Sequence, residues 1–272
     1  MFDAIATPSH SVQSVHLRNS AQFLYDIEPL HGPIELFERF FLRATAAALQ
    51  QGVSLSFISM DELLAVNAAN KDTWRPLVPI FDSRINNLGS QNAYAFVGRN
   101  SKGRIVAAQA GRLFDWRRSN FRDEITTLRL FFDNPADAIM RGESVTCDVD
   151  RADKVTGLVN YSGATWFHPE YRGTGLGYLM ARISRVLAHT RWNTDCTISV
   201  MAEGVVKGGY ARRCGYTDVR WGVQMNNFDC VETAQLALVV MPRHQIISDI
   251  EGFDRIVDEV LTSASIQQLA HA

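Results

Sequence analysis

The residues best suited to chemistry lie in the stretch HPEYRGTGLG, at positions 168–177. Gly173, Gly175 and Gly177 stand just before an apolar-periodic segment that favours a helix. Glycine permits positive φ and, having no Cβ, lets another group approach the backbone closely. Successive N–H groups at the start of a helix attract an anion, and the helix dipole strengthens that attraction. The stretch therefore predicts a binding site for a phosphate or pyrophosphate.

Two other phosphate-binding loops do not fit this stretch. A P-loop requires Gly-Lys-Ser/Thr before its helix, and a dinucleotide-binding turn requires the spacing G-x-G-x-x-G. Neither pattern occurs at positions 168–177. The alternative interpretation is a tight strand-to-helix turn that binds nothing.

Alternating and helical patterns predict the elements around the loop. A strand over 158–167 precedes it, Pro169 prevents that strand from continuing, and a helix over 176–190 follows. A helix begins near Pro33 and ends at Gly52, and Ser59 with Glu62 forms a capping box for the next one. The other predicted elements are strands over 53–58, 196–202, 216–225 and 236–247, a hairpin over 93–114, and helices over 205–213 and 253–269.

These patterns predict one mixed α/β domain over residues 51–250. A helical extension over 1–50 precedes it, and a C-terminal helix over 251–272 follows it. Residues 115–150 form an insertion before the fourth core strand, where basic and aromatic residues are interleaved. We interpret this insertion as a lid or a substrate-selecting segment.

Composition limits the function classes. The 272 residues carry a net charge of −2, and the pI is about 6.4, which does not favour nucleic acid or an acidic membrane surface as partner. We expect no membrane span and no secretory signal. The four cysteines form no CxxC pair, so we expect reduced thiols in a cytoplasmic protein and no metal site.

The pattern Arg172-x-x-Gly175-x-Gly177 resembles the acyl-CoA-binding loop of the GCN5-related N-acetyltransferase superfamily. The leading HPEYRG is typical of that loop, and GGYARRCGY at 208–216 is similar to the family's last conserved motif. The match is specific over residues 155–225 and looser over 53–114. Residues 1–50 and 115–150 match no part of the family pattern.

The resemblance implies a mixed sheet, splayed open between its fourth and fifth strands and flanked by helices. It implies acetyl-CoA, or another acyl-CoA, as co-substrate and an amine as acceptor. The pyrophosphate would lie on the backbone of Arg172, Gly173, Thr174, Gly175, Leu176 and Gly177. The pantetheine would pair with the backbone near Trp166 and Phe167.

The resemblance also suggests catalytic residues. Tyr210 is the candidate general acid, but it lies five residues before Gly215, where the family places its tyrosine four before. One residue turns a helix position by about 100°, so the alternative is a core tyrosine, unless Gly208 and Gly209 bend the helix. Glu203 follows the fifth strand and is either the general base or a solvated surface residue.

Three functions remain open at this level. The first is an acetyltransferase acting on an unidentified small-molecule or peptide amine by direct attack. The second is a catalytically silent module of the same fold that binds CoA or a partner. The third is a transferase with a larger acyl donor, whose pocket the insertion over 115–150 would shape. The sequence does not decide whether the protein forms a homodimer.

Overall fold

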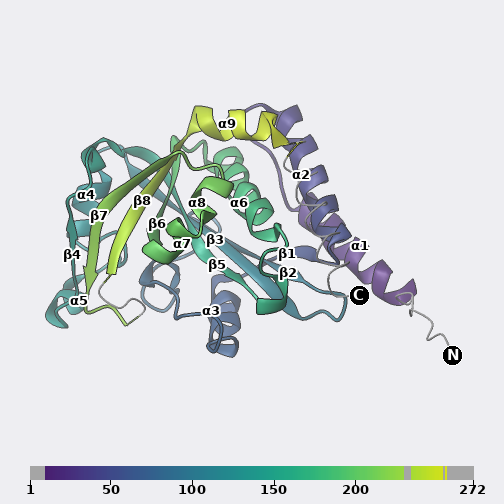
Figure 1. The fold of residues 1–272 in the computed structure, drawn as a ribbon, viewed down its shortest axis with the longest axis horizontal. Helices are drawn as coiled ribbons and strands as arrows, with labels where there is room; N and C mark the ends of the chain where they lie inside the picture. The colour runs from purple at the N-terminus through teal and green to yellow at the C-terminus, as the bar shows by residue number, and fades with distance from the viewer. Residues whose placement is uncertain (1–9, 230–233, 254, 256–272) are drawn as a thin grey trace.

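The computed structural model of the protein describes residues 10–229, 234–253 and 255 (Figure 1). No helix in these ranges is long and apolar enough to cross a membrane. The predicted helix over 253–269 lies almost wholly outside the described residues, as does Cys230.

Within the described residues, eight strands form one mixed sheet in the order β1-β2-β3-β5-β6-β8-β7-β4. Only β5 and β6 are parallel, and α6 makes the crossover that a parallel pair requires. The mixed sheet flanked by helices that the sequence predicted is confirmed. The strands are β1 (Ser54–Ile58), β2 (Ala93–Arg99), β3 (Ile105–Trp116), β4 (Ser144–Cys147), β5 (Gly157–Phe167), β6 (Cys196–Ala202), β7 (Asp218–Asn226) and β8 (Ala234–Pro242).

Helices cover both faces of this sheet. One face buries an apolar cluster with α2, α6 and α9, and the other buries a second cluster with α3, α4 and the segment 74–81. Figure 1 shows α9 beside α2 on one side of the molecule and α4 and α5 beside β4 at the other end. The helices are α1 (His10–Tyr25), α2 (Ile34–Gln50), α3 (Met60–Ala69), α4 (Phe121–Thr126), α5 (Ala136–Met140), α6 (Leu176–Trp192), α7 (Glu203–Lys207), α8 (Tyr210–Arg213) and α9 (Arg243–Glu251).

Several local signals placed element ends correctly. Pro33 is the N-cap of α2, and Gly52 adopts φ +70° just after its C-terminus. The Ser59 hydroxyl accepts from the Glu62 amide, and the Glu62 carboxylate accepts from the Ser59 amide. Such reciprocal bonds satisfy N–H groups that a helix start leaves free.

Two sequence predictions of secondary structure are wrong. The strand predicted over 236–247 ends at Pro242, and Arg243 begins α9. The helix predicted over 205–213 is two short helices, because Gly209 adopts φ +76° between α7 and α8. α1 lies within the helical extension predicted over 1–50.

The insertion over 115–150 is built into the core. Phe121, Ile125 and Phe131 are buried in the apolar cluster on the α3 side of the sheet, and β4 extends the sheet by pairing with β7. A lid would keep few buried contacts. The structure therefore does not support a lid in this segment.

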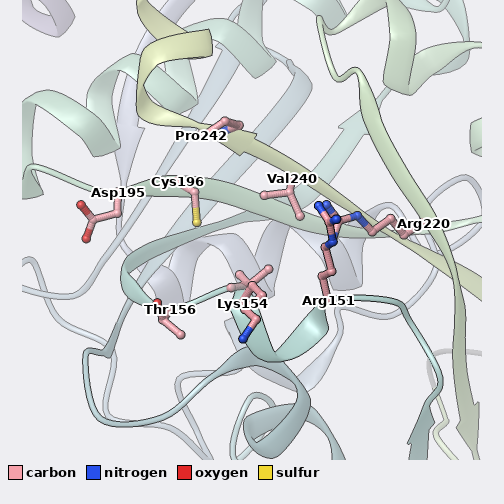
Figure 2. A pocket seen from close by; sticks show the side chains of 9 residues that line it. Arg151, Lys154, Thr156, Asp195, Cys196, Arg220, Val240 and Pro242 are labelled. Carbon is pink, nitrogen blue, oxygen red and sulfur yellow. The ribbon is translucent and has the colours of Figure 1, made fainter.

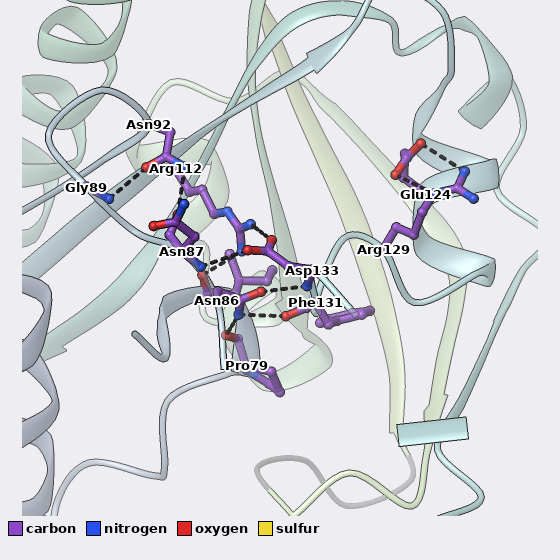
Figure 3. Close-up of polar contacts among 11 residues, drawn as sticks. Pro79, Asn86, Asn87, Gly89, Asn92, Arg112, Glu124, Arg129, Phe131 and Asp133 are labelled. Carbon is purple, nitrogen blue, oxygen red and sulfur yellow. Dashed lines mark hydrogen bonds and ion pairs between the residues drawn. The ribbon is translucent and has the colours of Figure 1, made fainter. Parts of the chain in front are cut away.

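A polar network ties the insertion to the loop before β2 (Figure 3). The Arg112 guanidinium donates to Asp133 at 2.6 Å and to the Ile80 carbonyl at 3.2 Å. Asn86 donates to the carbonyls of Pro79 and Phe131 and accepts from the Asp133 amide at 2.9 Å. These bonds satisfy buried backbone groups in two segments distant in sequence.

Candidate functional site

The site begins where β5 and β6 diverge. The two strands pair only from Val159 to Tyr161, although β5 continues to Phe167 and β6 to Ala202. Beyond that point β5 pairs with β3 alone and β6 with β8 alone. Two strand edges therefore face each other with unpaired backbone groups, as the predicted splay requires.

A β-bulge in β5 accompanies the divergence. Ala108 pairs with Trp166, but Ala110 pairs with Gly163, so β5 contains one extra residue. Ala164 in this stretch adopts φ +50°. A bulge bends its strand and increases the local twist, which carries the end of β5 away from β6. Sequence analysis missed this bulge, although an interior glycine at position 163 is a known signal for one.

A cavity of about 590 Å³ lies between the diverging strands. This is within the range of natural ligand pockets. Its walls come from the end of β5, the end of β6, and the α7–α8 segment. The residues are Val78, Tyr161, Gly163, Ala164, Thr165, Trp166, Phe167, Arg172, Ser199, Val200, Met201, Ala202, Gly204, Val205, Gly208, Tyr210 and Arg213.

The glycine loop adjoins this cavity and starts α6. Gly173 and Gly175 adopt φ +79° and +86°, a region that favours glycine. The Thr174 hydroxyl donates to the Tyr171 carbonyl at 3.1 Å, which fixes the turn. No acidic side chain lies in the first turn of this 17-residue helix, so nothing there neutralises the positive end of its dipole.

Arg172 holds the start of the loop in place. Its guanidinium donates to the Phe167 carbonyl at 3.1 Å and to the Thr73 carbonyl at 3.0 Å. The side chain is exposed and lines the cavity, so its positive charge remains accessible to an anion. Arg172 thus joins the loop to the end of β5.

Gly177 has a packing role. A Cβ there would lie 3.2 Å from the Phe167 ring and 3.3 Å from the Tyr210 ring. Both rings line the cavity, so the glycine brings the first turn of α6 against its wall. Leu176 beside it is fully buried and anchors the helix start.

The cofactor-side residues predicted on β5 also lie at the cavity. Trp166 is buried, stacks on Trp74 with ring centroids 5.2 Å apart, and donates to the Thr73 hydroxyl at 3.2 Å. Phe167 is half-buried on the other side of the strand. Both lie on the part of β5 that no longer pairs with β6, and the Phe167 carbonyl accepts from Arg172.

Tyr210 lines the cavity as the first residue of α8. Gly209 ends the helical geometry before Tyr210. The rotation of about 100° per residue in a continuous helix therefore does not determine where the Tyr210 side chain points. The hydroxyl donates to the Gly177 carbonyl at 3.4 Å. Burial, followed by the neighbouring Cys214, raises the pKa of Tyr210 well above its usual value, so the phenol stays protonated.

Glu203 lies apart from these residues. Its side chain is 59% exposed and pairs with Lys207 at 2.7 Å, one turn along α7. It is not among the residues that line the cavity. The structure therefore brings together Tyr210 and the glycine loop but does not bring Glu203 to them, and its placement matches that of a solvated surface residue.

α6 also carries two buried arginines, Arg182 and Arg185. Arg182 and Arg185 both pair with Asp249 of α9, at 2.9 and 3.1 Å. They also donate to the carbonyls of Arg213 and Cys214, at 3.2 and 2.6 Å. They thereby hold the C-terminal end of α8 against α6.

A second cavity, of about 650 Å³, lies at the opposite end of β6 (Figure 2). Arg151 and Arg220 point toward each other there, and Lys154 lies nearby. Each of these cations already pairs with an aspartate, at distances between 2.5 and 3.9 Å. Each cation therefore has a carboxylate neighbour outside the lining, and no glycine is among the described residues that line this cavity.

The strand order, the divergence of β5 and β6, and the glycine loop at the start of α6 agree with the mixed, splayed sheet that the sequence resemblance implies. Among the described residues, no three His, Cys, Asp or Glu side chains are grouped to hold a metal ion.

No protein-family model and no curated protein sequence matches this chain. Solved structures similar to it include a mutant of the spermidine N-acetyltransferase SpeG from Vibrio cholerae, at 10% identity and a TM-score of 0.43. That similarity covers 72% of this chain and 96% of the other. A protein from Klebsiella pneumoniae, described as an acyl-CoA N-acyltransferase, has 14% identity and a TM-score of 0.39, with coverage of 71% and 98%. At these values the similarity assigns neither an activity nor a substrate to this chain.

Proposed function

We propose that the protein is an acyl-CoA-dependent N-acyltransferase. In the simplest form it transfers acetyl from acetyl-CoA to a small-molecule or peptide amine. The observation that best supports this is the divergence of β5 and β6 beside a positive-φ glycine loop at the start of α6. A cavity that Arg172 lines lies between the glycine loop and the end of β5, and this arrangement would suit a pyrophosphate joined to an amide-containing chain.

The residues fit that co-substrate. The backbone of 172–177 would bind the pyrophosphate, with the Arg172 guanidinium close by. The edge of β5 that faces the splay, near Trp166 and Phe167, would hydrogen-bond the pantetheine amides, as one strand pairs with another. Buried free thiols at Cys147, Cys196 and Cys214 support a reducing compartment, and we place the protein in the cytoplasm.

The reaction also requires proton transfers. A lysine-like amine with a pKa near 10.4 costs about 4.6 kcal/mol to deprotonate at pH 7. The neutral amine attacks the thioester carbonyl, the C–S bond breaks, and the leaving thiolate takes a proton. Tyr210 is the proposed donor of that proton, because it is protonated and lines the cavity. We do not assign the base to Glu203, because it lies outside the cavity wall.

Thermal unfolding with and without acetyl-CoA tests the binding step. A ligand at 100 times its dissociation constant should stabilise the fold by about 2.7 kcal/mol. Gly175→Val should abolish this shift, because a β-branched side chain resists φ +86° and obstructs the loop. Gly52→Val is the matched control, since Gly52 also has positive φ but ends α2. An unchanged melting temperature with millimolar acetyl-CoA would refute the proposal.

Turnover of acetyl-CoA with a panel of amines separates the remaining alternatives. Release of CoA that depends on an amine supports the transferase. CoA binding without turnover of any amine would instead indicate the catalytically silent module. Stronger competition by longer acyl-CoAs would favour the larger acyl donor.

A further inference from the structure

Gln109 occupies an unusual position in β3. It is buried, with 1% of its surface exposed, and lies opposite the bulge of β5. The pairing steps from Ala108–Trp166 to Ala110–Gly163, so Gln109 faces both Ala164 and Thr165. A bulge interrupts the backbone ladder at such a point and leaves groups that need other partners.

The side chain of Gln109 bridges this interruption. Its Nε2 donates to the Gly163 carbonyl at 3.2 Å and to the Ser162 hydroxyl at 3.0 Å. Its Oε1 accepts from the Thr165 hydroxyl at 2.8 Å. A primary amide offers two donors and an acceptor in one plane, which suits a site that needs both. Gln109 therefore holds β5 on both sides of Ala164.

The same network reaches the helix that carries the glycine loop. The hydroxyls of Ser162 and Ser184 lie 3.2 Å apart, and Ser184 belongs to α6. The Tyr94 hydroxyl donates to the Ser184 carbonyl at 2.6 Å. The bulge is thus fixed relative to α6, and so to residues 172–177 at its start.

We propose that Gln109 is a positioning residue for acyl transfer. It acts through Gly163 and Thr165, which line the cavity, while Gln109 itself lies behind them. By fixing the bulge, it holds the edge of β5 where an acyl thioester would be aligned for attack. The inference rests on the proposed acyltransferase function, and a displacement of about 1 Å at such an edge can cost roughly a hundredfold in rate.

Four variants test this role. Gln109→Met keeps the length of the side chain and removes the amide. Thr165→Val removes the hydroxyl that donates to Oε1, and Thr165→Ser retains it. Gln245→Met is the matched control, because Gln245 donates to the Gly215 carbonyl and the Thr217 hydroxyl, away from the cavity. For each we would measure kcat, KM for acetyl-CoA, CoA affinity by calorimetry, and hydrogen exchange of the amides at 162–167.

Gln109→Met and Thr165→Val should lower kcat by about tenfold to a hundredfold and speed exchange at 163–166. Their CoA affinity should stay within about threefold of wild type, and Gln245→Met should retain turnover. Thr165→Ser should recover most of the kcat that Thr165→Val loses, because it keeps the hydroxyl that donates to Gln109. A folded Gln109→Met with wild-type kcat would overturn the proposal, as would an equal loss in Gln245→Met.

Two further outcomes are also decisive. If Gln109→Met does not fold, the kcat of Thr165→Val is compared with that of Thr165→Ser, because both variants keep Gln109. Equal kcat values in these two variants would overturn the proposal. If the wild-type protein turns over no acetyl-CoA, the proposed function fails. In that case hydrogen exchange alone tests whether Gln109 fixes the bulge. Unchanged protection of the amides at 163–166 in Gln109→Met would refute this role.

Discussion

Replacing Tyr210 by phenylalanine tests the general acid directly. Tyr210→Phe keeps the ring that packs against Gly177 and removes only the hydroxyl. A positioned proton donor contributes about 10²–10⁴ in rate, so kcat should fall by at least about a hundredfold. The affinity for CoA should be unchanged, because the glycine loop and the edge of β5 keep their geometry.

The structure also predicts a small effect of this change on stability. The hydroxyl donates to the Gly177 carbonyl over a long distance, 3.4 Å. A bond of that length should contribute no more than about 0.5 kcal/mol, which corresponds to a melting temperature shift of about 1–2 °C. Tyr178→Phe is the matched control, since its ring lies 6.1 Å from that of Tyr210 and it does not line the cavity.

The pH profile gives a second measurement on Tyr210. The acid works only while it is protonated, and its pKa is raised well above the usual value of 10.0. Loss of the proton should therefore lower kcat only above about pH 10. A stable Tyr210→Phe variant with wild-type kcat, or a wild-type alkaline decline well below that pH, would refute the assignment.

Two further predictions concern the groups that support the site. Asp249→Asn should leave Arg182 and Arg185 buried without a counter-charge and lower the free energy of unfolding by about 3–5 kcal/mol. Calorimetry should show a drop of about 6–20 °C in melting temperature. A melting temperature equal to that of wild type would show that these arginines find other partners. Burial raises the pKa of Cys147 and Cys214, and that of Cys196 to about 12, so at pH 8 little thiolate forms. Iodoacetamide should leave these three thiols unmodified in the native protein by peptide mass mapping, and rapid native labelling of any of them would contradict their burial.

The sequence predicted the parts of the site that depend on neighbouring residues. Gly173 and Gly175 predict positive φ, because glycine adopts that conformation without steric cost. Pro169 predicts the end of β5, because proline fixes φ and lacks the N–H that a strand needs. The prediction that the sheet is splayed came from the family resemblance, which those same residues carry. The capping box at Ser59 was visible for a similar reason, since its two partners lie three residues apart.

What the sequence did not reveal depends on contacts between distant segments. The bulge at Ala164 requires knowing that Gln109 lies opposite it, and β3 is about fifty residues away in the chain. Arg182 and Arg185 look like a solvated helix face until α9 supplies Asp249. The interleaved basic and aromatic residues of the insertion over 115–150 favoured a lid or a substrate-selecting segment, yet Phe121 and Phe131 are buried in a core with strands formed elsewhere.

These distant contacts converge on α6. Its first turn forms the glycine loop, and Ser184 near its middle connects to the bulge through Ser162. Arg182 and Arg185 hold the carbonyls that end α8, whose first residue is Tyr210. All three features of the candidate site are therefore positioned by one helix that is buried from Leu179 to Thr190. A perturbation inside α6 should thus change CoA affinity and kcat together, whereas Gln109→Met and Tyr210→Phe should each lower kcat and leave CoA affinity nearly unchanged.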